Sequence, residues 1–172
     1  MELKTFFLRQ VEHEAAMNRK VLERVPEGRN DWKPHEKSMA LGYLAALVAS
    51  MPGWVAFMIQ RDELDFEDPS TEQFRTKPVE TRAELLQLLE ENAGKARRAL
   101  EGTDEAHLLR QWRMVSGHRL LSEGPRHIMI ADAVFSHLAH HRGQLTVYLR
   151  LNEAAVPAIY GPSADESEWG PS

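Results

Sequence analysis

The sequence predicts an all-α protein, a four-helix bundle of antiparallel helices with one longer connection. Apolar residues recur at spacings of three and four in four long stretches, the period of an amphipathic α-helix. Turn-forming or acidic segments separate these stretches. The 172 residues, 42% hydrophobic and 27% charged, suit one globular domain with a substantial core. We therefore expect a single domain over residues 1–172, with 155–172 as an extended tail.

The first two helices are expected on either side of a loop. Residues 3–25 carry a mixed three-and-four apolar repeat, and Pro26 begins the turn sequence that ends it. Ser38 is a suitable N-cap for the second helix, which is apolar almost all round. Pro52 and Gly53 break that helix, and the helical pattern resumes after the break. Such an apolar helix is expected to lie deep in the bundle or in a subunit interface.

The acidic segment 62–77 is expected to form the longer surface connection. A third helix should begin at Thr81, because Glu84 completes a capping box, and end at Gly102. Residues 112–121 have a less regular pattern that predicts extended or loop structure. The last helix should run from about 126 to 151, roughly 39 Å at the α-helical rise. Its inward face should carry Ile130, Val134, His137, Leu138, His141, Leu145 and Tyr148.

Composition excludes several classes of function. The chain has no cysteine, which rules out disulfides, zinc–thiolate sites and cysteine nucleophiles and suits a reducing cytoplasm, where we expect the protein. A net charge of −5 argues against nucleic acid or anionic lipid as a partner. No apolar run is long enough to span a bilayer, and no phosphate-binding loop or nucleophilic serine turn is present.

A histidine pair is the most informative feature of the chain. His137 and His141 are four residues apart, so a helix places both imidazoles on one face, one turn apart, where they can grip one metal ion. The alternative is a pair of core histidines that hydrogen-bond to polar groups of the bundle. Two imidazoles are also fewer than the three protein ligands usual for a catalytic zinc. His140 points about 100° away round the helix, toward another helix or a subunit interface.

The histidine segment resembles the DinB/YfiT-like family, whose members are regarded as metalloenzymes. The resemblance is carried by residues 135–145 (FSHLAHHRGQL), by 35–39 (HEKSM) through 51–54 (MPGW), and by the tail segment 156–166 (VPAIYGPSADE). It spans nearly the whole chain. It implies a four-helix bundle, commonly a homodimer, with a metal such as zinc or nickel held by three histidines. It also implies relatives that are transferases or isomerases dependent on low-molecular-weight thiols.

The chain departs from this resemblance at the third metal ligand. In similar sequences the second helix reads along the lines of Leu-Gly-x-Leu-Ala-x-His-Val-Ala, whereas residues 41–49 here read LGYLAALVA. Leu47 therefore stands where the third histidine belongs, and leucine cannot bind a metal. We expect metal binding through His137 and His141 to be weak or absent. The expected pocket residues are Tyr43, Leu47, Met51, His140 and Gln144.

Three functions remain open from the sequence. The first is a metal-dependent transferase or hydrolase acting on a small molecule, with His137 and His141 as ligands. The second is a metal-free protein that binds a small molecule or acts in a stress response, without catalysis. The third is a purely structural dimer. In each case the chain is expected to form a homodimer.

Overall fold

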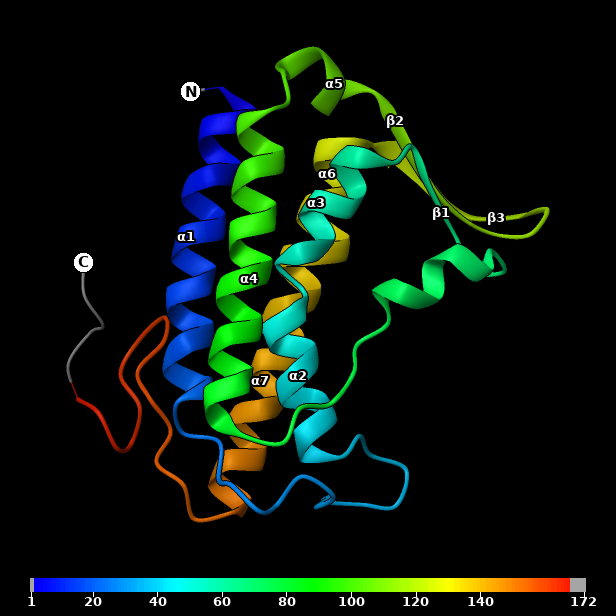
Figure 1. The fold of residues 1–172 in the computed structure, drawn as a ribbon. Coiled ribbons are helices and arrows are strands. Elements are labelled where there is room, and N and C mark those ends of the chain that lie inside the picture. Colours follow the sequence, from blue (N-terminus) through cyan, green and yellow to red (C-terminus); the bar gives the residue numbers. More distant parts are fainter. Residues whose placement is uncertain (1, 168–172) are drawn as a thin grey trace.

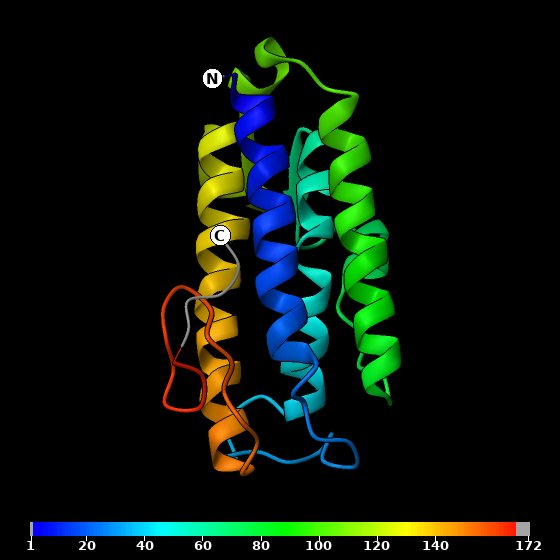
Figure 2. The same ribbon diagram turned by 90° about the vertical axis from the view of Figure 1, so that its left-hand side faces the viewer.

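Four helical columns lie side by side and form a bundle (Figures 1 and 2). The structure is a computed structural model, and it describes residues 2–167. The first and third columns are α1 (Leu3–Leu22) and α4 (Arg82–Glu101). The second consists of α2 (Leu41–Ser50) and α3 (Gly53–Gln60), and the fourth of α6 (Arg126–Ile130), the π-helical turn η2 (Ala131–Ser136) and α7 (His137–Leu151). The predicted bundle is confirmed, but its last helix contains a π-helical turn.

The longer connection changes the direction of one column. After α3 the chain forms β1 (Glu63–Asp65) and the 3-10 helix η1 (Pro69–Phe74), then returns along the bundle to the start of α4 (Figure 1). As a result α4 runs in the same direction as α2 and α3, so not all neighbouring columns are antiparallel. The predicted capping box is present at the start of α4, where the Thr81 hydroxyl and the Glu84 carboxylate each accept the other's backbone N–H.

A small sheet corrects the all-α prediction. After α5 (Glu105–Leu109), β2 (Gln111–Ser116) and β3 (Arg119–Pro125) form an antiparallel hairpin, and β1 pairs in parallel with β2. Gly117 makes the hairpin turn with a φ of 56°, a conformation that glycine adopts without strain. Trp112 and Met114 alternate with polar residues, as expected for a strand with one buried face. This alternation is too short to stand out in a sequence dominated by helical periods.

Helix α2 is the most buried part of the second column. All but two residues of α2 are buried, and the helix packs against α4 and α7. Its apolar surface is therefore covered within one protomer. Ser38 is not its N-cap. Backbone bonds from Leu41 to Trp32 and from Gly42 to Asn30 hold the preceding loop against the helix start, which shifts the cap to Ala40.

No single helix among the described residues is long and apolar enough to cross a membrane. Helices α2 and α3 reach that length and composition only together, and they are bent by 52° at the break between them.

The tail lies along α1 and α7 (Figure 2). One of its contacts is with a buried ion pair between these two helices. Arg142 of α7 is 1% exposed, and its guanidinium lies 2.6 Å from the Glu14 carboxylate of α1. The Tyr160 hydroxyl of the tail donates to the same carboxylate at 2.8 Å. The described part of the tail, up to residue 167, therefore packs against the bundle.

Candidate functional site

The histidine pair lies at the start of α7, directly after the π-helical turn. The Nε2 atoms of His137 and His141 are 2.8 Å apart, as the four-residue spacing predicts. The ring of Trp54, on α3, lies against His137 with centroids 5.7 Å apart. His141 is buried and His137 is half-buried, so His137 is the member of the pair that other molecules can reach.

A hydrogen-bond chain defines the proton positions in the pair. The Nδ1 of His141 faces the Gln144 Oε1 at 2.8 Å, so this nitrogen carries the hydrogen and donates it. The Nε2 of His141 then accepts the Nε2–H of His137. Burial lowers the pKa of His141, and the nearby His137 and His140 rings lower it further, while the bond to Gln144 opposes them. Burial therefore favours the neutral form of the His141 ring.

A cavity of about 580 Å³ opens beside His137 and is mainly apolar. We call it the apolar cavity. Its walls come from α2, α3, the sheet, the 66–76 connection and the π-helical turn. They comprise Tyr43, Leu47, Trp54, Phe57, Met58, Leu64, Phe66, Thr71, Arg75, Thr76, Trp112, Met114, Asp132, Ala133 and His137. Cavities of this size and character accommodate drug-sized or smaller organic molecules.

Of the five expected pocket residues, only some line the apolar cavity. Tyr43 and Leu47 line the apolar cavity, with Leu47 only 7% exposed. Gln144 contacts the site indirectly, through the Nδ1 of His141. His140 is exposed, although its ring lies 5.1 Å from that of His141. Met51 is fully buried in the core and is not part of the cavity wall.

The side chains present do not form a three-ligand metal site. In the part of the chain from 2 to 167, no three histidine, cysteine, aspartate or glutamate side chains come together in a way that could hold one ion. Two nitrogens of a tetrahedral zinc lie about 3.3 Å apart, given Zn–N bonds of about 2.0–2.1 Å, so the histidine pair would have to open slightly to bind one. His118 lines a separate hollow beside the sheet, and His127 bonds to the Leu108 carbonyl. Neither side chain takes the place of the third histidine ligand, where this chain has Leu47.

Several wall residues were beyond the sequence analysis. The sequence suggested that Trp54 and Trp112, like Trp32, are core or pocket-wall residues, whereas Arg75 and Asp132 were not considered for the site. Trp112 and Met114 reach the cavity because their strand presents alternate residues to it. The aromatic residues were a usable signal, since they are common in small-molecule sites. No local pattern predicts that the 66–76 connection borders the same cavity as α3.

The fold and the site together define a helical bundle whose last helix carries a histidine pair beside an apolar cavity. Residues 1–171 match the family model described as the DinB family, and the chain belongs to that family. A DinB-like protein of Bacillus subtilis is 19% identical, with a TM-score of 0.65 over 94% of this chain and 98% of that one. A DinB-like protein of Bacillus cereus is 17% identical, with a TM-score of 0.68 over 90% and 95%. No match was found among curated proteins.

Proposed function

We propose that this protein binds a small, mostly apolar organic molecule in the apolar cavity, without a tightly held metal ion. The observation that carries the proposal is that Leu47 and His137 line the same cavity. At the position where the resemblance implies a third histidine, the wall is therefore an isobutyl side chain. This makes that corner of the cavity drier and favours an apolar ligand over a metal-bound one.

The polar groups of the apolar cavity would fix the orientation of a bound molecule. His137 presents the accessible ring of the pair, and Asp132 lines the cavity beside it from the π-helical turn. Arg75 and Thr76 line the cavity from the connection before α4. A few polar groups around an apolar wall fix the orientation of a bound molecule while apolar burial supplies most of the affinity.

A weakly metal-dependent enzyme is the second candidate, and the facing Nε2 atoms of His137 and His141 favour it. Two imidazoles in this position suit zinc or nickel. In this alternative the ion would polarise a small substrate, for which a low-molecular-weight thiol is the class implied by the resemblance. With a leucine in place of one imidazole, the ion would be held loosely.

The proposal is tested with N-phenyl-1-naphthylamine, a neutral apolar dye whose fluorescence rises on entering an apolar site. We expect saturable binding to the wild-type protein purified without an affinity tag. Ala133→Phe should weaken binding about tenfold or more, because the new ring occupies cavity space. Ala139→Phe is the matched control, since Ala139 is half-buried on the same column but lines no part of the cavity.

Two outcomes would contradict the proposal. One is no saturable dye binding to the wild-type protein. The other is equal binding by Ala133→Phe and Ala139→Phe, provided that circular dichroism shows both variants folded. Stoichiometric zinc or nickel in the untagged protein, lost on His137→Ala, would instead support the metal-dependent candidate.

A further inference from the structure

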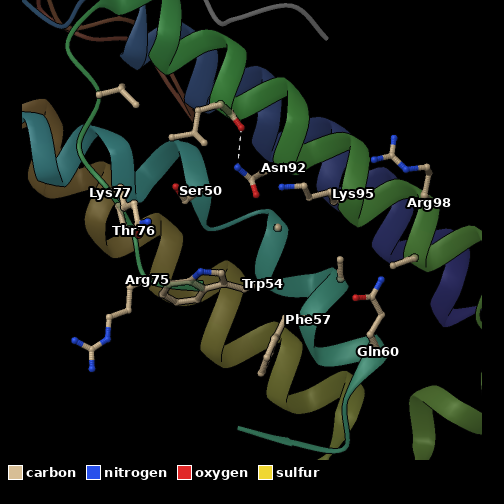
Figure 3. Close-up of a pocket in the computed structure, with 15 residues that line it drawn as sticks. Ser50, Trp54, Phe57, Gln60, Arg75, Thr76, Lys77, Asn92, Lys95 and Arg98 are labelled. Carbon is tan, nitrogen blue, oxygen red and sulfur yellow. Dashed lines mark hydrogen bonds between the residues drawn. The ribbon is translucent and has the colours of Figure 1, made fainter. Parts of the chain in front are cut away.

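A second cavity lies on the other side of α3, between α3, α4 and the connection before α4 (Figure 3). Its volume is about 700 Å³. It shares Trp54, Phe57, Arg75 and Thr76 with the apolar cavity but contains neither histidine of the pair. We call it the cationic cleft. We propose that it binds a small anionic molecule that carries a carboxylate or phosphate group on an apolar or aromatic body.

Charge is the first argument for an anionic ligand. Arg75 and Lys77 from the connection, and Lys95 and Arg98 from α4, line the cleft, while no aspartate or glutamate does. The chain as a whole has a net charge of −5, so this concentration of positive charge runs against the average. Cations gathered in a concave site focus their field and raise the local concentration of anions.

Most of these cations form no ion pair with other described residues of the protein. Arg75 has an ion pair with Glu72, its neighbour in η1, at 2.8 Å. For Lys77, Lys95 and Arg98, the described residues provide no carboxylate within ion-pair distance. By contrast Arg97, the neighbour of Arg98 on a different face of α4, pairs with Glu12 of α1. The side chains that stabilise the bundle and those around the cleft are thus different sets.

The inner wall of the cleft is buried and lies where α3 packs against α4. Asn92 of α4 is 9% exposed and its Nδ2 donates to the Leu88 carbonyl at 2.8 Å, as Figure 3 shows. This bond uses one amide hydrogen and leaves the second for another acceptor. A Cβ added to Gly53 would lie 2.2 Å from the Asn92 Oδ1, so the Asn92 side chain occupies space that any larger residue at position 53 would take from it.

The apolar residues of the cleft indicate that the rest of the ligand should be apolar or aromatic. Trp54 and Phe57 lie on the α3 side of the cleft (Figure 3), and Val79 and Leu88 contribute aliphatic surface. An inorganic ion alone would leave this apolar surface unused. An anionic group attached to a flat or aliphatic body uses both the cations and the apolar wall.

The test compares two dyes with the same aromatic body. The probe 1-anilinonaphthalene-8-sulfonate is N-phenyl-1-naphthylamine with an added sulfonate. In an Ala133→Phe background, where the new ring takes up space in the apolar cavity, we expect saturable binding of the sulfonated dye that pyrophosphate displaces. Adding Lys95→Gln and Arg98→Gln should weaken this binding about tenfold or more, as expected for two lost charge-assisted contacts.

The matched control makes the same charge change away from the cleft. Arg29→Gln with Lys33→Gln removes two exposed cations of the loop before α2, so binding should stay within about twofold of the parent if long-range charge is screened. Equal loss in both double variants, or no loss in the cleft variant, would overturn the proposal. The neutral dye on the wild-type background checks the apolar cavity separately, so failure of one proposal is distinguishable from failure of the other.

Discussion

At the residue scale, His141 makes stability dependent on pH. Its pKa is lowered from the usual 6.5, first because it is buried and then because the two neighbouring histidines oppose its charge. As pH falls through 6.5, the unfolded chain therefore takes up this proton before the folded chain does. The contribution of His141 to stability is fully present above pH 6.5 and is lost as pH falls through the lowered pKa of the folded state.

Urea denaturation at pH 7.5 and 5.5 measures this effect. We expect the loss of stability between these two pH values to be smaller for His141→Gln than for the wild type, because glutamine does not titrate. His118→Gln, which removes an exposed histidine at the hairpin turn, should behave like the wild type. An identical pH dependence in wild type and His141→Gln would show that burial of this ring has no effect on its protonation.

The residue scale also shows what a sequence can reveal about the site. The helical spacing correctly placed the two histidine rings within contact, because an α-helix fixes the relative positions of residues four apart. The same spacing did not predict where Met51 and His140 lie relative to the apolar cavity, whose wall includes neither. Met51 lies one turn from Leu47, yet the bend between α2 and α3 leaves it in the core instead of the cavity wall.

At the scale of elements, a buried ion pair between Glu14 and Arg142 joins α1 to α7, and Tyr160 of the tail bonds to it. Removing the Glu14 carboxylate would leave the Arg142 guanidinium with only its bond to Asn18, at 2.8 Å, its distant bond to the Glu14 carbonyl and its contact with Tyr160. Truncating one partner of a buried pair typically destabilises by about 3 kcal/mol or more. We expect Glu14→Ala to lower the free energy of unfolding by about that amount.

The control for this prediction is an exposed ion pair of the same bundle. Glu90 pairs with Arg19 at the surface, and both side chains are largely accessible. Glu90→Ala should change the free energy of unfolding by less than about 1 kcal/mol. If equilibrium urea unfolding gave the same small loss for both variants, the pair between Glu14 and Arg142 would not hold α1 to α7 as described.

The elements differ in how far the sequence predicts them. The helices were predictable because their apolar period extends over many residues, and the Thr81 cap because it is a local motif. The extended or loop structure expected at 112–121 corresponds to β2 and β3, but β1 was not predicted, since it has only three residues and pairs with β2 from a distant part of the chain. The π-helical turn at Ala131–Ser136 has no local signal at all.

At the scale of the whole molecule, the bundle covers its most apolar helix without a second copy. The composition of α2 was one reason to expect a dimer, but α4 and α7 bury it within the protomer. The homodimer therefore rests on the family resemblance alone, and we keep it as a prediction. Light scattering at micromolar concentration should give twice the chain mass of 19.6 kDa. A mass equal to that of one chain would refute it.

Both cavities are properties of the whole chain. Each combines α3 with the connection before α4, and the apolar cavity adds the sheet and the π-helical turn. Their walls come from residues up to 94 positions apart in the case of Tyr43 and His137. The sequence could therefore suggest individual wall residues, but the enclosed space depends on long-range packing that local periodicity does not encode.

The most direct test of the central claim is a calorimetric titration of zinc into untagged wild type and Leu47→His. The account predicts weak or undetectable binding to the wild type, and tightening by about a hundredfold or more in the variant, because the new imidazole completes a three-histidine ligand set. Tight stoichiometric binding to the wild type, with no gain from Leu47→His, would contradict the claim that leucine at this position turns a metal site into an apolar cavity.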